Sequence, residues 1–209
     1  AMEYVEGWEL DEVLWRLSCV DVRLPQPAVI DILRQIADGI AYAHAATDDL
    51  GPSLTLVHRA LQPQNISLDK RGVVQIADFG LAKSTANLYQ TTEANVTRGS
   101  PLYMSPEQIE GKPLDGRSDL FAIGSIASEL STGVRPFEGN SIPNTLIKIL
   151  AADFGDSLSI MEAEFPQLAP IVRRLFAQLR EERYRDGYAL LEDLELLSDG
   201  RSVGAHTRA

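Results

Sequence analysis

Apolar residues recur at helical spacing over most of the chain. The clearest stretch is residues 28–46, where apolar side chains stand three or four positions apart and would form one stripe of a long helix. The prolines before it suit the first turn of a helix. The same spacing predicts further helices at residues 9–18, 144–152, 168–180 and 187–197. The pattern is that of a mainly α protein.

One stretch differs because it is apolar around nearly its whole circumference. Residues 117–132, "RSDLFAIGSIASELST", lack a clear polar face, which is typical of a helix buried at the centre of a domain. Ser118 is a candidate N-cap for this helix, and Gly133 suits its end. We therefore expect a central buried helix over residues 117–132.

Strand-like sequence is confined to one region. The β-rich runs are "LTLVH" (54–58), "ISL" (66–68) and "VVQIA" (73–77), and the "DKRG" sequence between the last two is typical of a hairpin turn. The predicted order is two helices, a small β-hairpin patch with polar loops, and then helices.

Composition narrows the partners and the compartment. The 209 residues suit one domain, and 19 basic against 30 acidic residues give a net charge of −11, which disfavours nucleic acid and anionic membranes as partners. No apolar run approaches the ~20 residues of a membrane span. The lone Cys19 fits a reducing, cytoplasmic location and is expected to be a small core residue. His44, at the end of the first long helix, is expected to pack against neighbouring residues or to cap the helix.

Several polar motifs occur in a fixed order along the chain. They are "HRALQPQN" (58–65), "DFG" (78–80), "GSPLYMSPE" (99–107), "SDLFAIG" (118–124) and Arg183 in "EERYRD". Together they resemble the C-terminal lobe (C-lobe) of a eukaryotic-like, bacterial-type serine/threonine protein kinase. The implied parts are a kinase C-lobe at 2–199, a hinge at 2–8, a catalytic-loop remnant at 58–65, an activation segment at 78–107, the central helix at 117–132 and a flexible tail at 200–209.

Three positions depart from the pattern of that family. Ala60 stands where the resemblance implies the catalytic aspartate, and a methyl group cannot accept a proton from a substrate hydroxyl. Gln62 replaces the lysine that neutralises the transferred phosphate. Ser67 replaces a large apolar residue beneath adenine. Deliberate inactivation would explain Ala60 alone, but an engineer would not change all three, so natural loss of catalysis is the favoured interpretation.

Other residues match the family's cofactor site. Asn65 and Asp78 are the candidate Mg²⁺ ligands, because Mg²⁺ prefers hard oxygen donors, and with Ser67 they form a vestigial nucleotide site. We predict no cofactor for this chain, although the family uses Mg-ATP.

The residues with structural roles in the family are retained. Glu107 and Arg183 match a buried ion pair, Asp119 matches the helix aspartate that holds the catalytic-loop backbone, and His58 and Phe79 match an apolar column. Arg59 matches the arginine that pairs with a phosphate on the activation segment. Candidate phosphorylation sites are Thr91, Thr92 and Thr97.

The family's smaller, N-terminal lobe (N-lobe) carries sequences that do not occur here. Neither G-x-G-x-x-G nor V-A-I-K appears in the 209 residues. The leading hypothesis is therefore a catalytically inactive C-lobe, a pseudokinase that acts as an interaction or regulatory module. Its partner would be another protein, an N-lobe, or a second copy bound through the uncovered hinge face. The alternative is part of a serine/threonine kinase that binds Mg-ATP and phosphorylates proteins when an N-lobe is present.

Overall fold

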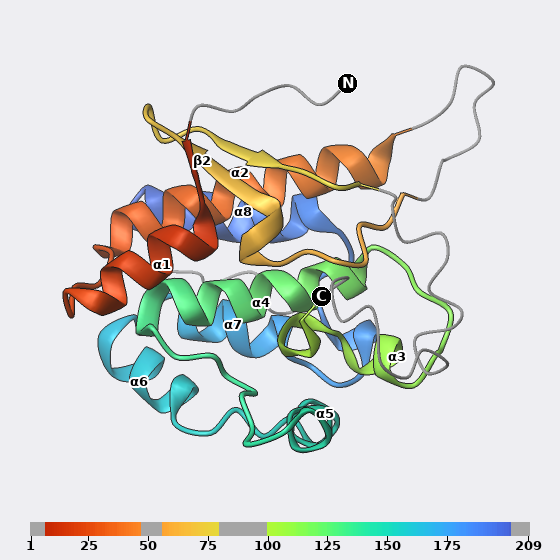
Figure 1. Ribbon diagram of the computed structural model, residues 1–209. Helices are drawn as coiled ribbons and strands as arrows, with labels where there is room; N and C mark the ends of the chain where they lie inside the picture. Colours follow the sequence, from red (N-terminus) through yellow and green to blue (C-terminus); the bar gives the residue numbers. More distant parts are fainter. Residues whose placement is uncertain (1–6, 47–55, 80–99, 202–209) are drawn as a thin grey trace.

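The computed structural model describes residues 7–46, 56–79 and 100–201, and it is mostly helical with one small antiparallel sheet (Figure 1). The helices are α1 (Leu10–Cys19), α2 (Gln26–Ala45), α3 (Pro106–Ile109), α4 (Arg117–Thr132), α5 (Ile142–Ala151), α6 (Ser157–Glu164), α7 (Ala169–Leu175) and α8 (Gly187–Ser198). Short 3₁₀ turns lie at η1 (Pro63–Asn65), η3 (Pro101–Tyr103) and η4 (Arg180–Glu182). Among these described helices, none combines the length and the apolar character that crossing a membrane requires.

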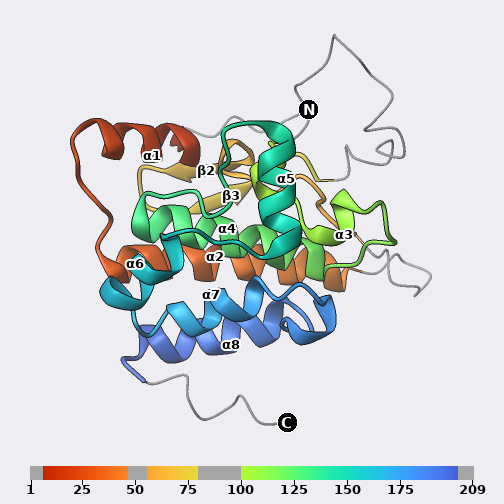
Figure 2. The ribbon, with the colours of Figure 1, turned by 90° about the horizontal axis from the view of Figure 1, so that it is seen from below.

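Helix α4 lies at the centre of the molecule (Figures 1 and 2). Every residue from Ser118 to Thr132 is buried, and the helix packs against α2, α6 and α7. Its bounds agree with the prediction, and Gly133 ends it with a left-handed φ of 71°. The proposed N-cap was wrong: the helix starts at Arg117, so Ser118 lies inside the first turn. There its hydroxyl donates to Glu107 instead of capping the backbone.

An aromatic cluster fills the space beside α4. Phe121, Phe137, Phe154 and Phe176 form five ring pairs with centroids 4.9–5.8 Å apart. Gly124 makes this packing possible, because a Cβ at that position would lie 2.9 Å from the Phe176 ring. The rings come from α4 and from three later segments of the chain, so they join those segments to the central helix.

The sheet has the strand order β1 (Gly7–Glu9), β2 (Ile66–Asp69), β3 (Val74–Ile76). The β2–β3 hairpin confirms the predicted turn: the Asp69 carboxylate accepts from the amides of Arg71 and Val73, and Gly72 has φ 84°. Strand β1 was not predicted. It includes the last two residues of the expected hinge and pairs Gly7 with Asp69, so closely that a Cβ on Gly7 would meet the Leu68 carbonyl oxygen at 2.3 Å.

Two other local predictions were wrong. Residues 56–58 of the expected strand 54–58 are not in a strand, because the His58 amide is bound by a side chain from α4. Cys19 is exposed rather than buried, because α1 has only Leu10 fully inside the core. Helices α3 and α6 were not predicted, since each is short and has few buried apolar positions.

The helix expected over 168–180 ends early, at Leu175. Beyond it, the Ala177 carbonyl accepts a hydrogen bond of 2.8 Å from the buried Arg183, and the Gln178 carbonyl accepts a longer one. A helix that continued would use these carbonyls in its own ladder. The chain therefore leaves the helix here, and Leu179 is left 60% exposed.

Candidate functional site

The loop at 58–65 is held by one carboxylate from α4. Asp119, which is only 1% exposed, accepts hydrogen bonds from the backbone amides of His58 (2.8 Å) and Arg59 (2.9 Å). Arg59 has φ 66°, a left-handed conformation that costs a residue with a side chain roughly 1–2 kcal/mol. Hydrogen bonds to an ionised group offset a cost of this size. The helix aspartate thus fixes the path of the loop backbone.

A third donor to the same carboxylate was not foreseen. His44, at the end of α2, donates from Nε2 to Asp119 at 2.8 Å. Its ring lies where a side chain on Gly116 would have to be, 2.5 Å from the position of an added Cβ. We expected His44 to pack or to cap a helix, and this prediction did not include its hydrogen bond to Asp119. The only local signal was a histidine in the last turn of the helix.

The His58 ring links the loop to the end of β3. Its Nε2 lies 2.8 Å from the Ala77 carbonyl, which can only accept, and its Nδ1 accepts from the Ala60 amide at 3.3 Å. The ring is therefore the neutral tautomer with its proton on Nε2. Phe79 meets it edge-on at 4.7 Å, so the two residues expected to form an apolar column are in contact.

Ala60 lies half-buried in the middle of the loop, with a methyl group as its entire side chain. Its carbonyl accepts from the Asn65 side-chain amide at 2.8 Å. The Asn65 carbonyl in turn accepts from the Ala77 amide at 2.8 Å, which places Asn65 next to the residue that precedes Asp78. Asp78 is exposed, with φ 64°, another left-handed residue that carries a side chain. Such strained positions are concentrated at functional sites.

The two candidate Mg²⁺ ligands would make an incomplete site by themselves. Within the described ranges, no three His, Cys, Asp or Glu side chains lie close enough together to hold a metal ion. Asn65 and Asp78 offer an amide oxygen and a carboxylate, which are hard oxygen donors of the kind that Mg²⁺ prefers. The remaining ligands would have to be nucleotide phosphates and water. Ser67 lies on β2, half-buried, paired with Glu9 and Gln75.

A segment after residue 99 lies against this loop. Gln62 accepts a hydrogen bond from the Ser100 amide at 2.9 Å, and Gln108 donates to the Arg59 carbonyl at 2.7 Å. Neither contact was predicted, since the family pattern has a lysine where Gln62 stands and says nothing of Gln108. The side chain of Gln62 is thus engaged with backbone and does not supply a positive charge.

Glu107 and Arg183 form a buried ion pair. Arg183, 2% exposed, makes two hydrogen bonds to the Glu107 carboxylate, of 2.8 and 2.9 Å. Ser118 adds a third bond to Glu107 at 2.7 Å, and Arg183 also binds the Arg117 carbonyl at 3.0 Å. Burial acts to raise the pKa of Glu107, but the hydrogen bonds and charge of Arg183 outweigh it and hold the pKa below its ordinary value. The pair ties α3 to the segment before α8.

A second buried network holds the turn η3. Tyr103 donates to Glu129 of α4 at 2.5 Å, and Arg135 binds the other oxygen of that carboxylate at 2.8 Å. Burial and the neighbouring charge of Glu129 raise the pKa of Tyr103 far above its ordinary value, so the phenol stays a neutral donor. Nothing in the sequence pattern indicated this contact.

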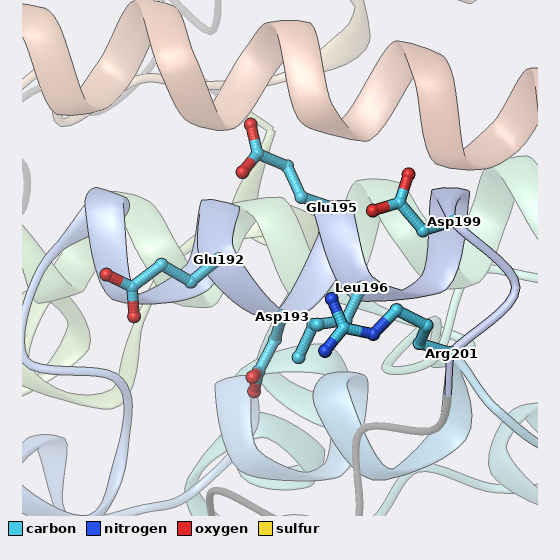
Figure 3. Close-up of a pocket in the computed structure, with 6 residues that line it drawn as sticks. All are labelled: Glu192, Asp193, Glu195, Leu196, Asp199 and Arg201. Atoms are coloured by element: carbon cyan, nitrogen blue, oxygen red, sulfur yellow. The ribbon is translucent and has the colours of Figure 1, made fainter.

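A shallow hollow on α8 lies apart from these residues. It is lined by Glu192, Asp193, Glu195, Leu196, Asp199 and Arg201. Figure 3 shows that the carboxylates of Glu192, Asp193 and Glu195 point in different directions. Asp193 already accepts from Tyr184, and Glu195 lies 3.7 Å from Arg34. These side chains do not converge on one point.

Some of the predicted parts lie outside the described residues. They are residues 2–6 of the hinge, residues 80–99 of the activation segment with Thr91, Thr92 and Thr97, and most of the tail at 200–209.

Comparison with known sequences identifies the class of protein. A protein kinase domain family matches residues 1–184, and the chain belongs to the protein kinase family. Among named relatives, serine/threonine-protein kinase PknL of Mycobacterium tuberculosis is 34% identical over 198 residues, covering 95% of this chain and 46% of that protein. Tyrosine-protein kinase MasK of Myxococcus xanthus is 32% identical over 194 residues, covering 93% of this chain and 30% of that protein. The chain thus spans about half the length of PknL and less than a third of MasK.

Proposed function

We propose that this chain is a kinase C-lobe that does not transfer phosphate through its own loop and that acts as an interaction or regulatory module. The observation that carries the proposal is Ala60, which puts a methyl group where the loop needs a proton acceptor. The sequence "HRALQPQN" contains no carboxylate, and Gln62 offers no charge in place of the expected lysine.

Nearby carboxylates are poor substitutes for the missing base. Asp119 is buried and already accepts from three donors, so a substrate hydroxyl could not reach it. Asp78 is exposed, but it follows β3 and is a candidate Mg²⁺ ligand, so it would not be free to act as a base when a metal ion is bound. A carboxylate that binds Mg²⁺ is a weak base, because the cation stabilises its ionised form.

The alternative function is a serine/threonine kinase that phosphorylates proteins when an N-lobe is present. Two observations favour it: Asn65 and Asp78 are both retained and lie at the ends of one hairpin, and named relatives include serine/threonine kinases. The loss of a general base costs roughly 10²–10⁴-fold in rate, so Ala60 would reduce phosphate transfer without abolishing it. The two proposals therefore differ in a measurable rate.

Phosphate transfer is tested with radiolabelled ATP and a generic basic protein as acceptor. We expect no incorporation above an Asp78→Ala control, both for this chain and for the product of the whole open reading frame. A gain of activity in Ala60→Asp would identify the missing carboxylate as the cause. Incorporation by the unaltered protein above the Asp78→Ala level would contradict the proposal and favour the alternative.

Nucleotide binding is tested separately by thermal shift. Because a ligand that binds the folded state raises the melting temperature, tight binding of Mg-ATP must be visible in a titration. We expect no shift up to millimolar Mg-ATP, since Ser67 reduces the apolar contact beneath adenine. A saturable rise that disappears in Asp78→Ala would show that the cofactor site still works.

The proposed partner is a protein, an N-lobe or a second copy. Trp8 on β1, Val73 and Phe79 are large apolar residues left partly exposed on the sheet side of the molecule. Light scattering at increasing concentration separates self-association from the other two. A cytoplasmic location remains a prediction from the single cysteine.

A further inference from the structure

The segment that follows residue 99 is attached to the loop at 58–65 through an acceptor on Gln62. The Gln62 side-chain oxygen receives the Ser100 amide proton at 2.9 Å. A lysine could not make this contact, because an ammonium group donates three hydrogen bonds and accepts none. The glutamine at this position is therefore more than the loss of a charge, since it forms a bond that the family's usual residue cannot form.

The other end of the segment is attached through a donor on Gln108. Its side-chain oxygen accepts from the Ser105 amide at 2.9 Å, while Ser105 caps the Gln108 amide, which together form a capping box at the start of α3. Its side-chain nitrogen is then free to donate to the Arg59 carbonyl at 2.7 Å. One amide group thus closes α3 and binds it to the loop.

Between these two ends the segment forms its own turns. The Tyr103 amide bonds to the Ser100 carbonyl at 3.3 Å, and the Met104 amide bonds to the Pro101 carbonyl at 3.2 Å. Both contacts to the loop join a neutral amide side chain to a backbone group, so neither depends on a titrating group. Screening by salt is also weak for such contacts, in contrast to pairs between exposed charges.

We propose that Gln62 and Gln108 form an amide latch that keeps residues 100–109 closed against residues 58–65 without phosphorylation. This inference deepens the proposed function, since it concerns regulation of the same site, but the latch would exist whether or not the chain transfers phosphate. In many kinases the corresponding order depends on a phosphate that pairs with arginine. The latch replaces that switch with a permanent neutral contact.

Three substitutions separate the two bonds of the latch. Gln62→Lys removes the acceptor for Ser100, whereas Gln62→Glu keeps it. Gln108→Glu keeps the capping box but removes the donor to Arg59, because an ionised carboxylate only accepts. Gln64→Ala is the matched control, since Gln64 lies in the same loop, is exposed, and makes no side-chain hydrogen bond to any described residue.

The readout is hydrogen exchange at the amides of Tyr103 and Met104, which donate to the carbonyls of Ser100 and Pro101 and not to either glutamine. Loss of a hydrogen bond of ordinary strength makes local opening about 2- to 10-fold more frequent. We expect this increase in Gln62→Lys and Gln108→Glu, a larger one in the double variant, and none in Gln62→Glu or Gln64→Ala. Phosphatase treatment of the unaltered protein is expected to change nothing at these amides.

Two results would overturn the latch. One is unchanged exchange at Tyr103 and Met104 in a double variant that melts as the unaltered protein does. The other is faster exchange after phosphatase treatment, which would show that a phosphate holds the segment. If the double variant does not fold, the exchange rates of Gln62→Lys and Gln62→Glu are compared instead, and equal rates in the two variants would overturn the latch. Phosphate transfer by the unaltered protein would contradict the proposed function and leave these exchange rates as they are.

Discussion

Replacing Arg183 by alanine is expected to lower the free energy of unfolding by about 3–5 kcal/mol, the usual cost of leaving a buried charge without its partner. The variant removes both bonds to Glu107 and leaves the carboxylate with Ser118 alone. It also leaves the carbonyls of Arg117 and Ala177 without that donor. Urea unfolding followed by far-ultraviolet circular dichroism measures the loss.

Arg173→Ala is the control for this prediction. Arg173 pairs with Glu162 at the surface, where an ion pair contributes about 0–1 kcal/mol. Because the pKa of Glu107 is lowered in the folded protein, the stability it provides is present above its ordinary value of 4.5 and is lost as the pH falls below it. The difference between Arg183→Ala and the unaltered protein should therefore shrink in acid. A loss equal to that of the control would refute the role of the pair.

Asp119→Ala is expected to cost a similar amount, about 3–6 kcal/mol, for a different reason. The substitution leaves the amides of His58 and Arg59 and the ring of His44 without an acceptor. A buried donor left unpaired costs about 1–3 kcal/mol, and the Arg59 and His44 donors, which are only partly buried, are expected at the low end of that range. Arg59 also loses the bond that offsets its left-handed φ. Unfolding in urea measures the total, and hydrogen exchange at residues 58–60 measures the local effect.

Asp115→Ala tests whether the loss of stability in Asp119→Ala comes from the buried position of that carboxylate or from the removal of any negative charge near the start of α4. Asp115 precedes the same helix and pairs with Arg117, but it is partly exposed, so its removal should cost about 0–1 kcal/mol. Exchange at residues 58–60 should be unchanged in this variant. Equal losses for Asp115→Ala and Asp119→Ala would mean that the loop is held by something other than the Asp119 carboxylate.

Elements with a strong local pattern were predictable from sequence. The repeat of apolar residues in α2 and the lack of a clear polar face in α4 are properties of contiguous sequence, and both helices formed close to the expected bounds. The early end of α7 was not predictable in this way, because it depends on Arg183, which lies outside the helix and binds the carbonyl of Ala177 just beyond its end. Strand β1 depends likewise on pairing with β2, far along the chain.

In the candidate site, too, some features were predictable from sequence and others depend on distant residues. The resemblance to kinases pointed to Asp119 and to the pair of Glu107 with Arg183, because these residues keep the family's identities, and the structure places them in contact with the expected partners. It could not indicate what a substituted residue does. Gln62 was interpreted only as a lost charge, whereas its contact with Ser100 depends on the folded position of a distant segment.

The burial of α4 has a consequence for synthesis of the chain. A polypeptide emerges from its N-terminus, and domains form as their parts become available. Helix α2 precedes α4, but α6 and α7, which also pack against it, follow it and end at Glu164 and Leu175. Until residue 175 has left the ribosome, the apolar surface of α4 has no complete cover. The nascent chain therefore passes through an interval in which its central helix is exposed to aggregation or to chaperones.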